Sequence, residues 1–416
     1  MDARLVAPPD KALSHRAALL LALSARGGRV RGFSRARDAE STLGVLKALG
    51  AGIRREGADL LFSGGGRKSL KAPAGDLDCG NSGSTMRMLA GVLAACPFEG
   101  RLVGDASLGR RPMARIADPL AAMGASVFLE DGHAPLRIRG GRLRGIDWTS
   151  PVASAQVKTA VLLAGLAAEG RTSFTEPVSS RDHTERMLGY LGVPVRTSGT
   201  TVSVEGGVSW EGGDLEIPGD SSSAAFFVVA SCLREGWKVR VGQVGLNPTR
   251  LGFLRVLERM GARVSIRQDA VVCGEPVGEL SAEGGSRLKG IRISAEEVPS
   301  LVDELPILAL AATQAEGETV VSGASELRVK ESDRIAALVA GLGAMGAKIQ
   351  ALPDGFRVEG PTPLKGAAVD SFGDHRIAMT LMVAGKLASG RTEVQGADSA
   401  DVSYPGFAEA LEKAVR

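Results

Sequence analysis

The sequence predicts an α/β protein of six similar units, three in each of two domains, and three observations support this. An apolar helix end, a glycine and a short strand recur along the chain, and their glycines lie 74, 68, 69 and 85 residues apart. In phase with that recurrence, polar clusters open helices of small and apolar residues. The chain has 416 residues, more than one hydrophobic core usually fills. A recurrence of this kind decides the architecture and is therefore interpreted first.

The helix–glycine–strand pattern is clear in five segments, and a sixth is incomplete. The five are Leu46–Ile53, Leu120–Val127, Leu188–Val195, Leu257–Val264 and Leu342–Ile349, and the C-terminal GFAEALEKAVR resembles a sixth copy without its strand. Glycine after the last helical turn is a common stop signal, and branched apolar residues then favour a strand. Each unit is expected to run strand, helix, strand, helix and then further strands.

Polar clusters mark the expected helix starts. They are Asp10–Arg16, Gly80–Arg87, Ser154–Lys158, Gly219–Ser223, Asp303–Glu304 and Gly373–Arg376. The first turn of a helix leaves backbone N–H groups unpaired at the positive end of the helix dipole, and both effects favour anions. The openings therefore indicate sites for anionic groups.

The domain boundary is expected where proline and glycine interrupt the chain and the recurrence restarts, at 217–220. The predicted domains are residues 10–218, and residues 1–9 together with 219–416. This division requires Arg4–Pro9 to pair as a strand with the C-terminal half. The chain would then cross between the domains twice, which makes a natural hinge.

Composition excludes several classes of protein. The 50 basic and 47 acidic side chains nearly balance, which argues against general nucleic-acid or membrane-surface binding. The four cysteines show no C-x-x-C pairing and are expected to be reduced, and neither a signal peptide nor a membrane-spanning apolar run is evident. We expect a soluble, cytoplasmic monomer whose partners are small molecules. The four histidines lack metal-site spacing, so no metal is expected.

Cationic residues accompany the openings of the N-terminal half. Lys11 and Arg16 begin an apolar helix, and either a solvated capping turn or an anion site would explain them. Arg87 follows the Gly/Ser-rich segment GNSGST, which a simple turn into a helix would explain as well as an anion site. Arg111 precedes Pro112 at an expected helix start, where a cation opposes the dipole unless an anion binds it.

Acidic residues characterise the C-terminal half. Asp303 and Glu304 interrupt an apolar stretch, and helix capping is the ordinary explanation for them. In RVKESDR, a helix would bring Lys330 and Glu331 to Arg334 by i,i+4 and i,i+3 spacing. A solvated charged face is the default for such a run, but a core-like helix follows it directly, so the charged turn is expected to face a cleft.

Five motifs in this order resemble the enolpyruvyl transferases, in the branch whose acceptor is shikimate 3-phosphate. They are GNSGSTMR, RRPM, ASAQVKTAVLLAGL, RVKESDR and GDHRIAM, and the resemblance covers essentially the whole chain. It implies two domains of three βαβαββ-type units each, an inside-out α/β barrel with helix N-termini facing a cleft. It also implies transfer of the enolpyruvyl group of phosphoenolpyruvate to the 5-hydroxyl of shikimate 3-phosphate, without a cofactor or metal.

The resemblance also implies roles for individual residues. Asp303 would be the general base, Glu331 the general acid, and Lys11 a further catalytic residue. Shikimate 3-phosphate would be held by Lys11, Arg16, Ser154, Gln156, Arg181, Asp303 and Lys330. Phosphoenolpyruvate would be held by Lys11, Gly83, Arg111, Gln156, Arg334 and Arg376. Gly83 matches relatives that have room for glyphosate, so sensitivity to that inhibitor is expected.

Two positions depart from the family pattern. Ala12 stands where the family usually has a serine that touches the acceptor's phosphate, and Val402 stands where some members carry a lysine.

Two other functions compete with the one that the resemblance implies. One alternative is the sister branch that acts on UDP-N-acetylglucosamine, but its cysteine is missing from the loop GDASLGRRPM. The other is a non-catalytic anion-binding relative. Turnover with both substrates would separate an enzyme from such a scaffold.

Overall fold

A computed structural model describes residues 2–414, which form two compact units. The N-terminal unit holds Pro9–Ile217 and the short segment Val272–Glu275. The C-terminal unit holds the chain up to Pro8, then Pro218–Val271, and the chain from Pro276 onward. Residues 415 and 416, which end the segment GFAEALEKAVR, lie outside the described residues. No sequence pattern separates Val272–Glu275 from its neighbours, so the expected boundaries lack this short segment.

Each repeat of the N-terminal unit is a four-stranded sheet with two main helices. The second repeat, with strand order β5-β6-β8-β7, shows the pattern most plainly. Its elements are β5 (Leu77–Asp78), α3 (Gly83–Ala94), β6 (Glu99–Val103), α5 (Ala114–Ala122), β7 (Ser126–Glu130) and β8 (His133–Arg139). A short helix, α4 (Ala106–Gly109), precedes α5. β5 and β6 are parallel and the others antiparallel, so the repeat is a βαβαββ unit.

The third repeat has the same order, and the first borrows a strand. The third comprises β9 (Asp147–Thr149), α6 (Ala155–Gly165), β10 (Arg171–Thr175), α7 (His183–Tyr190), β11 (Val195–Ser198) and β12 (Thr201–Glu205). The first comprises α1 (Lys11–Leu23), β2 (Gly28–Arg31), α2 (Arg37–Ala48), β3 (Ile53–Glu56) and β4 (Asp59–Phe62), with a 3₁₀ turn η1 (Arg67–Ser69) after it. Its missing first strand is β13 (Leu215–Glu216), which pairs in parallel with β2.

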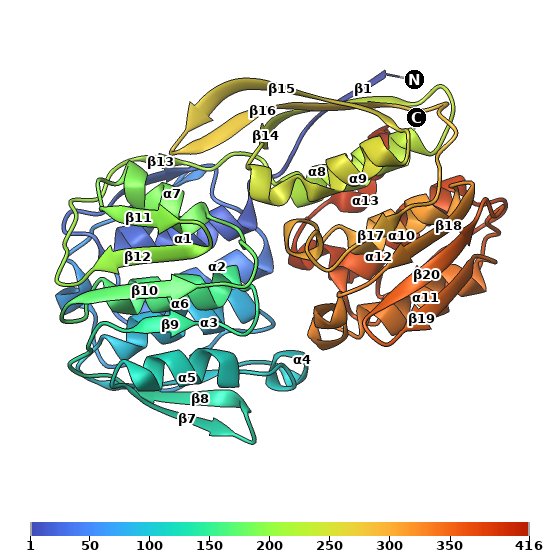
Figure 1. Ribbon diagram of the computed structural model, residues 1–416. Helices are drawn as coiled ribbons and strands as arrows, with labels where there is room; N and C mark the ends of the chain where they lie inside the picture. The colour runs from blue at the N-terminus through green and yellow to red at the C-terminus, as the bar shows by residue number, and fades with distance from the viewer. Residues whose placement is uncertain (1, 415–416) are drawn as a thin grey trace. The chain divides into compact units, whose positions relative to one another are not determined.

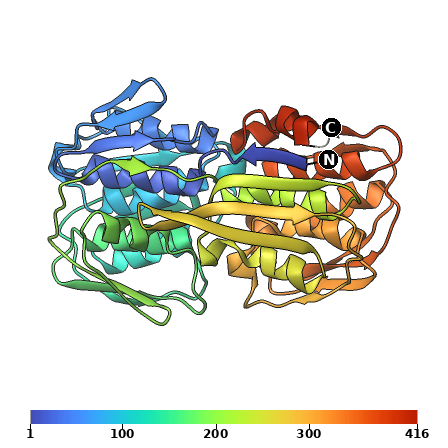
Figure 2. The same cartoon turned by 90° about the horizontal axis from the view of Figure 1, so that it is seen from above.

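The C-terminal unit repeats the scheme with its own borrowed strand. Here β1 (Asp2–Val6) lies parallel to β14 (Lys238–Gly245), and Figure 2 shows the two side by side. The predicted pairing with this half is confirmed, but the strand was expected at Arg4–Pro9 and ends at Val6. That repeat also contains α8 (Ser221–Cys232), α9 (Gly252–Arg259), β15 (Arg263–Val272) and β16 (Glu275–Glu283). The next repeat contains β17 (Arg292–Ile293), α10 (Leu305–Thr313), β18 (Gly317–Val321), α11 (Arg334–Ala344), β19 (Lys348–Leu352) and β20 (Gly355–Gly360).

The sixth repeat is incomplete, as the sequence indicated. It has two parallel strands and two helices, namely β21 (Ala368–Asp370), α12 (His375–Leu387), β22 (Glu393–Gln395) and α13 (Phe407–Ala414). The 3₁₀ turn η5 (Ala397–Val402) and α13 follow where the other repeats form a hairpin. The rings of Tyr404 and Phe407 pack with Phe226 and Phe227 of α8, which places this segment on the core.

The helices, rather than the sheets, form the centre of each unit. Every residue of α8 and α10 is buried, and all but one residue of α3 is buried. Most residues of β15, by contrast, are exposed. Figure 1 shows β9, β10, β11 and β12 as a sheet in front of α6. Because a helix that is apolar all round must be buried, the sequence pattern explains this arrangement, with helices inside and sheets outside. Within residues 2–414, no helix is both long and apolar enough to cross a membrane.

Candidate functional site

All six polar openings begin helices, so that prediction is confirmed. Asp10, Ser82, Ser154, Asp220 and Asp374 accept backbone N–H bonds as N-caps of α1, α3, α6, α8 and α12. The sixth opening differs, because Glu304 precedes α10 but makes no side-chain cap bond and is only 1% exposed. Capping of α10 therefore does not account for Glu304.

In the N-terminal unit, hydrogen bonds tie together the first turns of α1, α3 and α6. Gln156 of α6 donates to Oγ of Ser84 in α3 at 2.9 Å. The buried Arg16 of α1 donates to Oγ1 of Thr159 in α6 at 3.0 Å and to Oγ1 of Thr184 in α7 at 2.8 Å. Three positive helix ends are thus held next to one another, which is an arrangement suited to anions.

Two guanidinium groups meet at Gly83, the first residue of α3. A Cβ built there would lie 2.9 Å from Nη1 of Arg87 and 3.1 Å from Nη1 of Arg111. Arg87 donates to Oε1 of Gln156 at 2.7 Å, and Arg111 donates to Oδ1 of Asn81 at 2.6 Å. Both arginines are buried, 9% and 5% exposed. Because buried like charges repel, an anion bound at this point would stabilise the cluster.

The position of Arg111 differs from the sequence prediction. It follows the short helix α4, while α5 begins three residues later at Ala114, so Pro112 does not open a helix. The side chain reaches back to Asn81, in the turn before α3, rather than to the start of α5.

Lys11 and Arg16 have different environments although both belong to α1. Nζ of Lys11 lies 2.8 Å from Oδ2 of Asp38, and its side chain keeps 17% exposure. Arg16 is 4% exposed, and besides its two hydroxyl partners it donates to the carbonyl of Ala12 at 2.9 Å. Lys11 therefore remains accessible to a substrate, whereas the observed bonds of Arg16 support the packing of α1 against α6 and α7.

A buried carboxylate organises the start of α6 and the loop after β10. Glu176 accepts from the backbone N–H of Ser154 at 2.8 Å and from the backbone and hydroxyl of Ser180. It also lies 3.1 Å from Nζ of the buried Lys158, which is 2.7 Å from Glu185. Burial raises the pKa of Glu185, against the opposing effect of Lys158. The half-buried Arg181 follows Ser180 directly, so this network positions both Ser154 and Arg181.

His15 of α1 lies in a buried hydroxyl network that reaches α2 and α3. Its Nδ1 is 2.7 Å from Oγ1 of Thr42, which is 2.7 Å from Oγ1 of Thr85 in α3. Burial lowers the pKa of His15 to about 4, although Asp38 opposes the shift. The imidazole is thus neutral at neutral pH and packs within this hydroxyl network.

His15 should make stability fall in mild acid. Since its pKa is lowered from 6.5 to about 4, the unfolded chain takes up a proton first as the pH drops. The contribution of neutral, buried His15 to the free energy of unfolding is fully present above pH 6.5 and is lost towards pH 4. The loss amounts to about 2–3 kcal/mol between pH 7.5 and 4.5. Urea unfolding at several pH values should show this loss in the natural chain, and a smaller one in His15→Gln. Equal losses would contradict it.

The cluster of the C-terminal unit centres on Arg334, the first residue of α11. This side chain is 2% exposed and binds three carboxylates. Its Nε lies 2.8 Å from Asp374, its Nη2 lies 2.7 Å from Glu331, and its Nη1 lies 3.5 Å from Asp303. The proposed base and acid therefore contact one guanidinium group. Glu331 and Asp303 keep 16% and 18% side-chain exposure, which leaves both accessible.

The expected helix across RVKESDR is wrong, although the expected contact exists. Residues 325–329 form a 3₁₀ turn and α11 begins only at Arg334, so Lys330 and Glu331 lie in the turn between them. Asp333 caps α11 by accepting from Ala336, and this cap stops the helix from extending backwards. The turn brings Glu331 to Arg334 without a helical backbone between them.

Charge and burial act in opposite directions on this cluster. Burial by itself lowers the pKa of Arg334, but Asp374, Glu331 and Asp303 outweigh it and raise the pKa. For Lys330, burial is the larger effect and lowers the pKa, against Asp303 and neighbouring carboxylates. Between Lys330 and Arg334, the charge of Lys330 is consequently the one that an additional nearby anion would stabilise more.

Arg376 is a buried cation with unused donors. It is the second residue of α12 and 3% exposed, with its guanidinium 6.0 Å from the centre of the Phe226 ring. Its Nε and Nη1 are buried and have no hydrogen-bond partner among residues 2–414. A buried charge without such partners costs several kcal/mol, so an anion at this helix start would stabilise it.

Three side chains support the candidate site residues, and the sequence singled out only one of them, Asp374. Asp38, Glu176 and Asp374 hold Lys11, Ser154 and Arg334 in place. Asp374 was visible as part of a polar opening, but Asp38 and Glu176 carry no distinguishing pattern. Their partners lie 27 and 22 residues away, so only the tertiary structure shows these pairs.

Comparison with known proteins identifies the family. The sequence profile of EPSP synthase (3-phosphoshikimate 1-carboxyvinyltransferase) matches residues 1–411. The chain belongs to this family. The 3-phosphoshikimate 1-carboxyvinyltransferase of Shouchella clausii (strain KSM-K16) is 48% identical over 414 residues, covering 99% of this chain and 96% of the relative. That of Desulfitobacterium hafniense (strain DSM 10664 / DCB-2) is 48% identical and covers 97% and 93%.

Solved structures agree with the family assignment. An EPSP synthase structure from Acinetobacter baumannii has a TM-score of 0.87 and 42% identity, with coverage of 99% of this chain and 95% of that one. The enolpyruvyl transferase NikO from Streptomyces tendae has a TM-score of 0.79 at 19% identity, a likeness of fold alone. The predicted enolpyruvyl transferase fold and family are therefore confirmed.

Proposed function

We propose that this member of the EPSP synthase family performs its reaction with Asp303 as general base and Glu331 as general acid. The reaction transfers the enolpyruvyl group of phosphoenolpyruvate to the 5-hydroxyl of shikimate 3-phosphate and releases phosphate. It belongs to the synthesis of aromatic amino acids through the shikimate pathway. The observation that carries the residue assignment is that Asp303 and Glu331 contact the same buried Arg334.

The cations among the assigned residues hold two phosphorylated substrates. For shikimate 3-phosphate the assigned residues are Lys11, Arg16, Ser154, Gln156, Arg181, Asp303 and Lys330. For phosphoenolpyruvate they are Lys11, Gly83, Arg111, Gln156, Arg334 and Arg376. Two phosphorylated anions about 4–6 Å apart repel by several kcal/mol, and these cations offset that repulsion. The unused donors of Arg376 support its assignment most directly.

The two carboxylates divide the proton transfers. Asp303 accepts the proton of the 5-hydroxyl as its oxygen attacks the enol carbon, and Glu331 donates a proton to the methylene carbon. The resulting tetrahedral intermediate loses that methyl proton and phosphate to give the enolpyruvyl ether. Lys11, held by Asp38 and partly exposed, places a positive charge at the phosphate that leaves. A placed acid or base contributes roughly 10²–10⁴-fold each.

Phosphate release tests this assignment against a non-catalytic anion-binding protein. The full chain with both substrates should release phosphate continuously, while either substrate alone should release none. Asp303→Asn should bind shikimate 3-phosphate but turn over much more slowly. Tight binding of both substrates by the natural chain without phosphate release would favour the anion-binding alternative.

Gly83 should control inhibition by glyphosate, which the assignment places against phosphoenolpyruvate. The natural chain should show competition between the two. In Gly83→Ala the new methyl group would lie 2.9 Å from Arg87 and 3.1 Å from Arg111, so both guanidinium groups must shift. We expect an inhibition constant about tenfold higher or more, a change of roughly 1.4 kcal/mol. The Michaelis constant for phosphoenolpyruvate should be measured alongside as the reference. If the inhibition constant for glyphosate is the same in Gly83→Ala as in the natural chain, this role of Gly83 is refuted.

A further inference from the structure

A pocket of about 400 Å³ lies within the N-terminal unit, at the opposite ends of the helices that carry the anion site. Leu23 is the last residue of α1, Ala95 caps the C-terminus of α3, and Leu166 caps that of α6. All three line the pocket. Since α1 spans 13 residues at about 1.5 Å each, the pocket lies roughly 20 Å from the substrate-binding turns. The proposed reaction makes no use of it.

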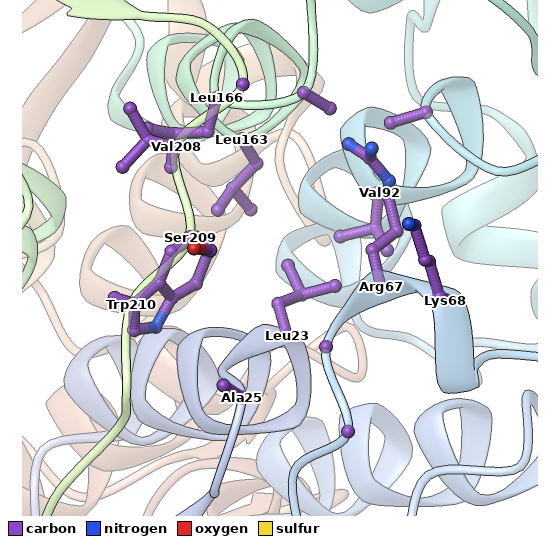
Figure 3. A pocket seen from close by; sticks show the side chains of 15 residues that line it. Leu23, Ala25, Arg67, Lys68, Val92, Leu163, Leu166, Val208, Ser209 and Trp210 are labelled. Atoms are coloured by element: carbon purple, nitrogen blue, oxygen red, sulfur yellow. The ribbon is translucent and has the colours of Figure 1, made fainter.

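The walls of the pocket differ in chemistry. The apolar wall consists of Leu23, Val92, Leu163, Leu166, Val208 and Trp210. Figure 3 shows Trp210 and Val208 on one side, and Arg67 and Lys68 on the other. The pocket is therefore apolar over most of its lining, with two cations together at one edge. Its size and composition are typical of sites for small organic molecules.

The apolar wall is fixed before any ligand arrives. Nε1 of Trp210 donates to the carbonyl of Leu20 at 3.0 Å, which sets the plane of the indole ring. The carbonyl of Trp210 accepts from the backbone N–H of Ala25 at 2.8 Å. The loop opposite is anchored as well, because Gly65 and Gly66 donate to the carbonyls of Ala25 and Ser24. A preformed wall lowers the entropy cost of binding.

The cationic edge of the pocket consists of Arg67 and Lys68. Arg67 and Lys68 form no ion pair or side-chain hydrogen bond within residues 2–414, although the chain contains many paired arginines. Arg67 is half-buried and Lys68 is exposed. Three consecutive glycines with φ of 67°, 106° and 69° precede them and shape the turn that presents both side chains. These two side chains are available to a negatively charged group.

We propose that this pocket binds a small aromatic monocarboxylate, with the ring on the Trp210 wall and the carboxylate on Arg67 and Lys68. The carbonyl ends of α1, α3 and α6 carry partial negative charge, so the carboxylate must lie on the cationic edge rather than on the helix ends. An aliphatic diacid would leave the apolar wall poorly filled, and an aromatic amine would be repelled by the two cations. The ligand is thus defined by one flat apolar body and one negative charge.

Three matched probes test this inference without any substrate of the proposed reaction. They are 2-naphthylacetate, its neutral amide and the corresponding 2-naphthylethylammonium ion. The chain has three tryptophans, so the indole N–H resonance of Trp210 can be assigned with Trp210→Phe and followed by nuclear magnetic resonance during titration. At the affinity per heavy atom usual for drug-sized ligands, the carboxylate should bind with a Kd of about 1 mM or below, and the other two at least tenfold more weakly.

Variants separate the two parts of the site. Arg67→Gln with Lys68→Gln should reduce the affinity for the carboxylate to that for the amide. The control, Arg142→Gln with Arg144→Gln at two exposed positions, should leave the affinities for both probes unchanged. Ala167→Phe, at a half-buried lining position, should fill the pocket and abolish binding of both probes. The Trp148 and Trp237 resonances report whether each variant remains folded.

Several results would overturn the inference. Equal affinity for the three probes would mean an apolar hollow without charge selection, and tightest binding of the ammonium ion would reverse the proposed polarity. A carboxylate affinity that survives Arg67→Gln with Lys68→Gln would remove the cations from the site. These surface substitutions leave the core intact, so this arm decides the matter even if Ala167→Phe fails to fold.

Discussion

Glu331→Gln is expected to lower kcat by roughly 10²–10⁴-fold while affinity for shikimate 3-phosphate changes by less than about threefold. Glutamine keeps the size of the side chain, and its carbonyl oxygen can still accept the 2.7 Å bond from Arg334. What it lacks is a transferable proton. Single-turnover rates and equilibrium binding of shikimate 3-phosphate should therefore separate, with the rate falling and the binding retained.

The exposed Glu359 offers a matched control for Glu331. It pairs with Lys348 on the outer face of β20 and lies 65% exposed, so Glu359→Gln should leave kcat and affinity unchanged. If Glu331→Gln reduced affinity and turnover equally, the residue would be a binding group and not the acid. Activity at the natural level would remove it from the chemistry altogether.

Arg334→Met is expected to destabilise the C-terminal unit by about 3–5 kcal/mol, because the substitution leaves a buried carboxylate without its cation. Asp374 is 0% exposed and receives two bonds from this guanidinium, while Glu331 and Asp303 add negative charge nearby. The loss should be measurable as a lower midpoint in urea unfolding at neutral pH. Catalysis should disappear as well, since the base and acid lose their common anchor.

A second substitution distinguishes lost charge balance from lost packing. Adding Asp374→Asn to Arg334→Met removes the stranded charge and should recover part of the stability. The double variant should not recover activity. Arg357→Met, at a half-exposed arginine of β20 in the same unit, should shift stability by no more than about 0.5 kcal/mol. A destabilised double variant, no better than Arg334→Met alone, would show that the cost is packing.

The sequence predicted the repeats because local chemistry repeats. A capped polar start, an apolar helix and a closing glycine depend on neighbouring residues, so Asp10, Ser82 and Asp374 could be recognised as helix starts. A first strand that pairs with the C-terminal half was also expected, but its partner β14 and the role of β13 in completing the first sheet were not. Strand partners distant in sequence leave little trace in either segment, and β13 spans only two residues.

The site was predictable in its cations and less so in its supports. Gly83 and Gln156 lie close together because the caps Ser82 and Ser154 fix the starts of α3 and α6, and Arg111 joins them from the turn after α4. Glu331 reaches Arg334 through a turn instead of a helix, since the cap at Asp333 decides where α11 begins. The carboxylates that orient Lys11 and Ser154 were invisible, because an acidic residue at a helix start or strand end is common in any protein.

The borrowed strands impose an order on folding as the chain is synthesised. The sheet of β2, β3 and β4 needs only β13 to be complete, so the first three repeats can assemble soon after residue 217 leaves the ribosome. β1 precedes these repeats in the chain, yet its partner β14 begins at Lys238. Strand β1 must therefore wait, unpaired, while the first three repeats fold behind it. An exposed edge of this kind is a point where a nascent chain needs protection from its neighbours.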